Sequence, residues 1–179
     1  MSCLYRMKLT SVVMILLAVV HSCGTEHPQK QPVPTQKEVN RSMEEINRQF
    51  ARDESAQIDG YIERRGWTMS TTGTGLRYMV YEATEGIEIK AGDRIEVNYE
   101  VSLLNGDVLY TSKERGPHVF TVGKDNVESG LHEGVLFMKT GEKAKFILPS
   151  HLAHGLSGDN DKIPPRSSVV YDIELISVK

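Results

Sequence analysis

Hydrophobic and polar residues alternate along the second half of the chain, and this period of two predicts β-strands. The alternation covers residues 76–82, 94–104, 108–112, 118–122 and 143–148. Asn105-Gly106, between two of these stretches, is a strong signal for a β-hairpin. A last run rich in β-branched residues follows the loop 149–168 and completes the predicted antiparallel sheet.

Helical spacing of apolar residues occurs in two segments. A capping box at residues 35–38 opens the first, and apolar residues then recur every three or four positions up to Ile62. The spacing weakens at residues 53–55, so it fits one long helix ending before Gly66, or two helices with a break near residue 54. We expect Ile58 to Ile62 to pack on the domain. For the earlier part, internal packing and a dimerisation arm are both open.

The second helical segment is short. Asp125 or Asn126 can cap it, and the apolar residues that follow at helical spacing are Val127, Leu131, Val135 and Met138. One short helix beside an antiparallel sheet predicts the α+β class. The double proline Pro164-Pro165 makes the loop before the last strand rigid, and we expect this loop and strand to form one wall of a pocket.

The N-terminus has the pattern of an export signal. Arg6 and Lys8 precede an apolar run over residues 9–20, which is shorter than the roughly 20 residues of a spanning helix. Residues 20–24 resemble a bacterial lipobox, which implies that the thiol of Cys23 is acylated. The alternative is an ordinary cleaved signal with an incidental cysteine, and translation can start at Met1 or Met7. We expect a signal peptide at 1–22, a Pro-rich tether at 23–34 and a lipid-anchored protein of the bacterial envelope, facing the periplasm or the cell surface.

Composition is that of an ordinary soluble domain. The 179 residues suit one core-bearing domain with extensions, and the net charge of -3 gives no electrostatic case for nucleic acid. Both cysteines, Cys3 and Cys23, precede the segments predicted to fold, so no disulfide is expected there. The histidine spacing fits no zinc site, and no phosphate loop or nucleophile elbow occurs, so we expect neither metal nor cofactor.

Several short motifs, in this order and spacing, resemble the FK506-binding-protein-type (FKBP-type) peptidyl-prolyl isomerases. They lie at residues 97–99, 103–106, 120–124, 130–135, 138–144, 153–155 and 171–175. The resemblance implies a twisted antiparallel sheet wrapped on one short helix over residues 67–179, after a helical extension at 35–66. The lipobox, the helix and residues 61–67 also resemble the gliding-motility-associated isomerase lipoproteins of Bacteroidetes.

Prolyl isomerisation needs no proton transfer and no nucleophile. Amide resonance sets a rotation barrier of about 18–20 kcal/mol, and exchange at X–Pro bonds is slow although cis and trans are close in energy. A dry apolar cup that holds the proline ring disfavours the planar, charge-separated amide relative to the twisted one. Donors that hold the carbonyl groups of the substrate complete the site.

The resemblance assigns site residues position by position. The catalytic residues that it implies are Tyr99, Tyr110, His154 and Tyr171, and the substrate-binding residues are Leu109, Phe120, Val127, Glu128, Leu131 and Ile163. Six of these positions depart from the usual residue of the family: Leu109 and Tyr171 replace phenylalanines, Tyr110 an aspartate, Glu128 an isoleucine, Leu131 a tryptophan and His154 a tyrosine. His118 also falls where a phenylalanine is usual. A histidine can still donate a hydrogen bond from a ring nitrogen.

The first functional hypothesis is a membrane-anchored prolyl isomerase that assists the folding of exported, proline-containing polypeptides. The pocket departures favour a first alternative, a weakly active or inactive FKBP-like binding or chaperone module. A second alternative is an accessory part of a surface machine. In the last case the helix at 35–65 would mediate self-association or docking.

Overall fold

The computed structural model describes residues 34–179. Two units make up the chain, Met1–Arg41 and Ser42–Lys179. The predicted signal peptide, Cys23 and nearly all of the predicted tether lie outside the described residues. None of the helices within residues 34–179 combines the length and the apolar character needed to cross a bilayer.

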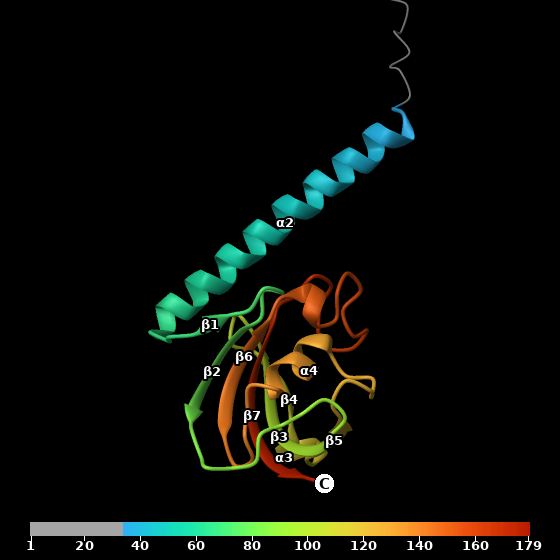
Figure 1. Ribbon diagram of the computed structural model, residues 1–179. Coiled ribbons are helices and arrows are strands. Elements are labelled where there is room, and N and C mark those ends of the chain that lie inside the picture. The colour runs from blue at the N-terminus through green and yellow to red at the C-terminus, as the bar shows by residue number, and fades with distance from the viewer. Residues whose placement is uncertain (1–33) are drawn as a thin grey trace, which may run out of the picture. The chain divides into compact units, whose positions relative to one another are not determined.

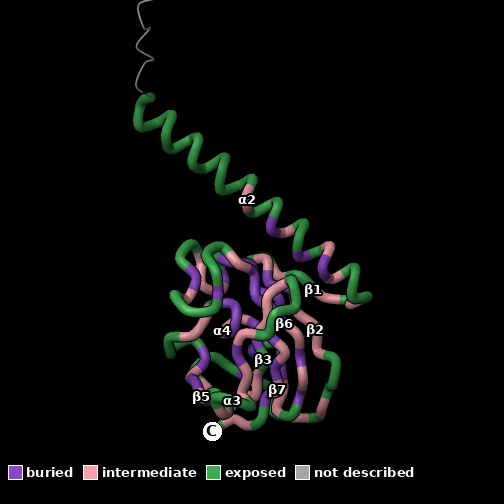
Figure 2. Tube along the Cα trace, turned by 180° about the vertical axis from the view of Figure 1, so that it is seen from behind, coloured by how far each residue is buried: buried purple, intermediate pink, exposed green. Residues whose placement is uncertain are grey.

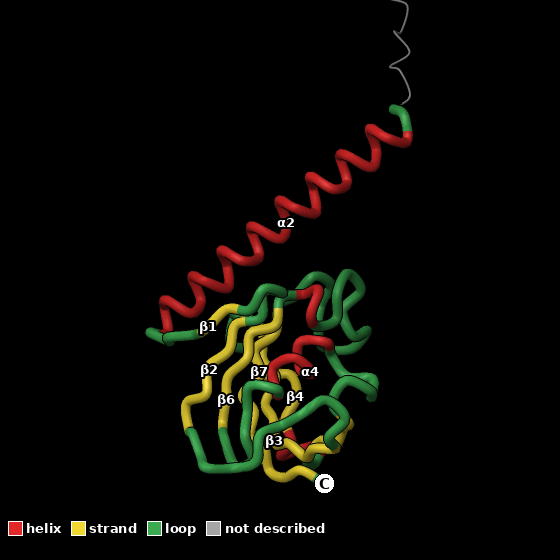
Figure 3. The backbone as a smooth tube through the Cα atoms, viewed as in Figure 1, coloured by secondary structure: helices red, strands yellow, loops and turns green. Residues whose placement is uncertain are grey.

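A single antiparallel sheet of seven strands forms the centre of the second unit (Figures 1 and 3). Its strand order is β1-β2-β6-β7-β3-β4, and β5 pairs with β3. The strands are β1 (Ser70–Thr71), β2 (Arg77–Glu82), β3 (Arg94–Leu103), β4 (Val108–Thr111), β5 (His118–Thr121), β6 (Lys143–Leu148) and β7 (Val169–Val178). All pairings are antiparallel, which confirms the predicted α+β class.

The strand boundaries agree with the alternation pattern to within a residue, except for β1, which the pattern did not predict. The β3–β4 hairpin also forms where Asn105-Gly106 predicted it. Its turn spans residues 103–106, with the N–H of Gly106 donating to the carbonyl of Leu103 at 2.9 Å. Gly106 then adopts a φ of 97°, and the register shifts by one residue after the turn.

Helix α2 (Gln36–Arg65) is continuous, so the alternative of a break near residue 54 is wrong. The predicted capping box is confirmed, because the N–H of Thr35 donates to Glu38 Oε2 at 2.7 Å and the N–H of Glu38 donates back to Thr35 Oγ1 at 3.4 Å. Glu54, where the apolar spacing weakens, is buried.

The remaining helices are short. Helix α4 (Ser129–Val135) starts later than predicted, and the expected cap by Asp125 or Asn126 is wrong: its N-cap is Glu128, which makes no side-chain cap bond. Asp125 accepts a hydrogen bond from the N–H of Thr121 instead. Two elements lie within predicted loops, helix α3 (Ser112–Arg115) and the 3-10 turn η1 (Ser150–Leu152).

Hydrophobic residues cover both faces of the sheet. Phe146 and Leu148 of β6 belong to the main core, where Gly134 and Gly130 of α4 approach them closely. Ile147, between them on the strand, points to the opposite face. There it packs with Val170 and with Ile58 and Tyr61 of α2. The expectation that residues 58–62 pack on the domain is therefore confirmed, and Figure 2 shows burial in α2 confined to its C-terminal half.

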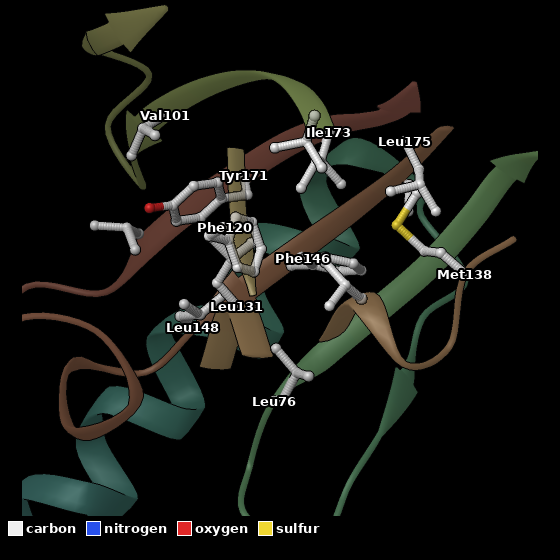
Figure 4. Close-up of a cluster of buried hydrophobic side chains, with 14 of the residues drawn as sticks. Leu76, Val101, Phe120, Leu131, Met138, Phe146, Leu148, Tyr171, Ile173 and Leu175 are labelled. Atoms are coloured by element: carbon white, nitrogen blue, oxygen red, sulfur yellow. The ribbon is translucent and has the colours of Figure 1, made fainter. Parts of the chain in front are cut away.

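The main core lies between the sheet and helix α4. Figure 4 shows its side chains gathered into one cluster, with Leu131, Phe120 and Tyr171 close together and Met138 beside Leu175. The aromatic ring of Tyr171 belongs to this core, and its hydroxyl oxygen lies at the edge of the cluster. Tyr171 can therefore serve both packing and a pocket wall.

Candidate active site

A cavity of about 550 Å³ opens beside this core, between α4, strands β3 and β7 and the loop that follows η1. This volume lies within the range of about 300–1,000 Å³ that is typical of small-molecule sites. The residues that line it are Val97, Tyr99, Val101, Tyr110, Arg115, His118, Asn126, Val127, Glu128, Leu131, Ala153, His154, Asp159, Asp161, Tyr171 and Ile173.

The floor of the cavity is apolar because strand periodicity directs alternate side chains to the same face. Val97, Tyr99 and Val101 alternate along β3, and Tyr171 and Ile173 do so along β7. Val101 lies directly opposite Tyr171, and Tyr99 lies directly opposite Ile173, across the neighbouring strands β3 and β7. Leu131 of α4, 2% exposed, closes the floor.

Tyr110 forms one side wall and is held by carboxylates of the opposite loop. Its hydroxyl donates to Asp159 and, at 3.2 Å, to Asp161. The guanidinium of Arg115 lies 4.0 Å from the centre of the tyrosine ring. Burial, followed by the hydrogen bond to Asp159, raises the pKa of Tyr110 to about 12. The phenol therefore remains a donor at neutral pH.

Asp159 organises the loop around that contact. Its Oδ1 accepts hydrogen bonds from the backbone N–H groups of Asp161 at 2.9 Å and Ile163 at 2.8 Å, while its Oδ2 receives the Tyr110 hydroxyl. Burial opposes ionisation of this carboxyl, but the hydrogen bonds outweigh it, so the pKa of Asp159 lies below its ordinary value.

Glu128 forms the second polar centre of the site. The hydroxyl of Tyr171 donates to its Oε1 at 2.9 Å, and Nε2 of His154 lies 2.8 Å from the same oxygen. Burial and then the negative charge of Glu128 raise the pKa of Tyr171 well above its ordinary value. Two phenol–carboxylate contacts thus flank the cavity, one on each side.

Most of the residues assigned from the sequence line the cavity, namely Tyr99, Tyr110, Val127, Glu128, Leu131, His154 and Tyr171. Leu109, Phe120 and Ile163 do not line it. Phe120 and Ile163 are buried in the core and Leu109 packs against it. Their role in substrate binding stays a prediction.

Sequence reasoning missed part of the lining. The alternation along β3 and β7 carried the signal for Val97, Val101 and Ile173, which share a face with Tyr99 and Tyr171. Asp159 and Asp161 had no such signal, because they lie in an irregular loop whose contact with Tyr110 joins residues about 50 positions apart.

A family model described as FKBP-type peptidyl-prolyl cis-trans isomerase matches residues 85–176, just over half of the chain. The chain belongs to this family. It is 41% identical over 105 residues to "FK506-binding protein 2" of Dictyostelium discoideum, which covers 58% of this chain and 77% of the relative. The matched part contains every residue that lines the cavity.

FkpA of Escherichia coli shares similarity beyond the isomerase segment. The FkpA sequence of strain K12 is 40% identical over 112 residues, which is 62% of this chain but 40% of the relative. The crystal structure of FkpA from Escherichia coli superimposes with a TM-score of 0.60 and 28% sequence identity, covering 97% of this chain and 82% of that one. The sequence match thus spans less than half the length of this relative, although the structural match spans more.

Proposed function

We propose that this FKBP-type protein catalyses cis–trans isomerisation of X–Pro bonds in exported polypeptides while anchored to a membrane through acylated Cys23. The observation that carries the enzymatic part is a cavity with a largely apolar floor that includes Tyr99 and Tyr171, and with Tyr110 as a side wall, within the segment that the family model matches. The anchoring part rests on the lipobox-like residues 20–24.

The geometry suits stabilisation of a twisted amide. The proline ring would enter over Val101, Leu131 and Ile173, where few polar groups solvate the planar amide. Tyr99 and Tyr171 would bound the ring, with Tyr110 on the side wall. His154 would face the substrate carbonyl, although its Nε2 is held near Glu128. The reaction requires no proton transfer, so these polar groups act by position.

The enzymatic proposal is tested with the full-length chain in detergent micelles and short peptides that contain an X–Pro bond. We expect acceleration of the cis-to-trans relaxation, and its loss in a Tyr99→Ala, Tyr171→Ala double variant. A full-length Met43→Ala variant, altered at an exposed position of α2, is the matched control and should keep its activity. No acceleration by the wild type with any X–Pro peptide would refute catalysis.

A peptide-binding or chaperone module is the second candidate, favoured by the carboxylates of Glu128, Asp159 and Asp161 at the cavity. These charges favour a hydrated pocket, which would weaken the desolvation on which catalysis depends. This candidate predicts that peptide binding and suppression of client aggregation persist in the double variant that lacks isomerase activity. If both vanish with isomerisation, the candidate fails.

Lipid anchoring is tested by replacement of Cys23. We expect wild-type protein in its native bacterial host to incorporate labelled palmitate and to fractionate with membranes, and a Cys23→Ser variant to do neither. Membrane fractionation of Cys23→Ser equal to wild type would count against the lipid anchor.

Helix α2 is the proposed docking or self-association arm, as would suit an accessory part of a surface machine such as the gliding apparatus. Its N-terminal half exposes Met43 and Ile46, 53% and 54% exposed, on one face of the helix. A Met43→Glu, Ile46→Glu variant should lower the sedimentation-derived mass or release bound partners, with isomerisation of short peptides unchanged. An unchanged assembly state and unchanged partner recovery would refute the arm.

A further inference from the structure

A buried carboxylate of α2 contacts both ends of the loop that borders the cavity. Glu54 is 7% exposed and makes its hydrogen bonds with neutral donors. Its Oε1 accepts from the backbone N–H of Ser150 at 2.7 Å and from the hydroxyl of Ser168 at 2.7 Å, and its Oε2 lies 3.2 Å from the hydroxyl of Ser150, which donates to it. Both serines are buried as well.

The two serines mark the ends of one functional loop. Ser150 begins the turn η1 directly after β6 and Pro149, and Ser168 directly precedes β7. Between them lie the cavity-lining residues Ala153, His154, Asp159 and Asp161. One carboxylate therefore fixes the point where the loop leaves the sheet and the point where it returns.

A second contact of α2 falls on the same loop. The guanidinium of Arg166 lies 4.7 Å from the ring centre of Phe50, one helical turn before Glu54. The backbone of Arg166 has a φ of 55°, which is uncommon for residues other than glycine. The backbone N–H of Arg166 donates to the carbonyl of Gly155 at 2.9 Å. The segment after the double proline is thus held against both the helix and the segment that carries His154.

The hydrogen bonds of Glu54 stabilise the loop because this carboxylate is buried. Burial of a carboxylate is strongly unfavourable unless hydrogen bonds compensate, and here the compensation comes from groups at the ends of the loop. Removal of the carboxylate would leave the Ser150 N–H buried without its acceptor, and such a group drives local rearrangement. The loop, rather than the sheet, would absorb that change because loops have the lower local stability.

We propose that Glu54 is a positioning residue for isomerisation, which holds the loop 150–168 so that His154 and Asp159 face the cavity. The inference rests on the proposed isomerase function. Displacement of catalytic groups by about 1 Å can cost up to about a hundredfold in rate. Helix α2 thereby supports the active site, and a change in how the helix packs on the domain would shift the pocket loop.

Three variants of the full-length chain separate positioning from stability. Glu54→Ala removes every hydrogen bond of the carboxylate. Glu54→Gln keeps the Oε1 acceptor for the Ser150 N–H and Ser168 hydroxyl, and its amide can donate to the Ser150 hydroxyl. Asp59→Ala is the matched control on the same helix, because Asp59 Oδ1 lies 2.9 Å from Nη2 of Arg77 on β2 and joins the helix to the sheet, not to the loop.

We expect Glu54→Ala to lower kcat/KM for an X–Pro peptide by about tenfold or more, with hydrogen exchange of amides 153–163 accelerated by a similar factor. Glu54→Gln should stay within about threefold of wild type in both measurements, and Asp59→Ala should keep the loop amides protected. If Glu54→Ala fails to fold, Ser168→Ala, which removes one of the bonds, should show a smaller change in the same direction.

The idea is overturned if Glu54→Ala leaves loop exchange unchanged, or if Asp59→Ala lowers kcat/KM and loop protection as much as Glu54→Ala does. Equal damage by Glu54→Gln and Glu54→Ala would also overturn it, since hydrogen-bond geometry would then not be the cause. An inactive wild type would refute the isomerase function separately, and loop exchange would still decide whether Glu54 positions the loop.

Discussion

Two glycines in helices are predicted to respond in opposite ways to the same substitution. Gly134 of α4 faces β6, and a Cβ atom there would lie 2.7 and 2.8 Å from two ring carbons of Phe146. That ring is fully buried, so it cannot swing away without disturbing the core. Gly60 of α2 is different, because a Cβ atom would meet the flexible end of Arg64, with Nη1 at 3.3 Å.

The magnitudes follow from two competing effects. Alanine is favoured over glycine by up to about 1 kcal/mol inside a helix, whereas an extra methyl in a packed core costs about 1–3 kcal/mol. For Gly134→Ala the steric clash with the buried ring of Phe146 exceeds the gain in helix propensity, which is small in a helix of seven residues. We therefore expect a net loss of about 1–2 kcal/mol. For Gly60→Ala only the gain applies, and we expect about 0.5–1 kcal/mol of stabilisation.

Equilibrium unfolding of the full-length chain in urea measures both. The midpoint should fall for Gly134→Ala and rise for Gly60→Ala, with the slope m unchanged in each. Because α4 also carries Leu131 of the cavity floor, Gly134→Ala should lower isomerase activity too. A Gly134→Ala variant as stable as wild type would refute the inferred close packing of α4 on β6, and so would shifts of the same sign in both variants.

Further substitutions test other contacts. Ile58→Ala should destabilise the protein by about 2–5 kcal/mol, since its side chain is fully buried under the sheet, whereas Ile46→Ala, at an exposed position, should change unfolding by less than about 0.5 kcal/mol. Tyr171→Phe removes the donor to Glu128 and should cost about 1 kcal/mol by denaturant unfolding; no change would show that the bond contributes nothing net. Asp159→Asn should be less stable than wild type at neutral pH. Because the folded-state pKa of Asp159 is depressed, its contribution is complete above the unfolded value of about 3.9 and disappears as the pH falls through the folded-state pKa, so stability curves that stay parallel in acid would contradict this.

The alternation of side chains predicted the sheet because a strand is recognised from its own residues. Residues 143–148 show this, since Ala144, Phe146 and Leu148 enter the main core, whereas Lys145 and Ile147 between them point to the opposite face. Strand β1 has only two residues and forms through pairing with β2, so no local period marks it. The cap of α4 was mispredicted because Asp125 uses its carboxylate for a nearer turn, on the N–H of Thr121.

Hydrogen bonds between polar residues far apart in the sequence account for most of the features that the sequence did not predict. Glu54 interrupts an apolar stripe, which suggested a break in the helix, yet its partners Ser150 and Ser168 lie 96 and 114 residues away. Tyr110 likewise meets Asp159 49 residues downstream. Such pairs leave no periodic trace, so the resemblance located Tyr110 in the pocket but could not give its partner.

The pocket combines an apolar floor with fixed polar walls, and this combination bears on the choice between catalysis and binding. The hydroxyls of Tyr110 and Tyr171 each donate a hydrogen bond to a carboxylate, which keeps both rings in place and directs the polar atoms to the sides of the cavity. A substrate proline would then contact ring faces and aliphatic side chains while the charges remain hydrogen-bonded within the protein. Fixed walls lower the cost of ordering side chains around a substrate. Because a twisted amide gains from an apolar surround and a ground-state peptide does not, the loss of a wall hydroxyl should affect kcat more than peptide affinity if the site is catalytic, and both equally if it only binds.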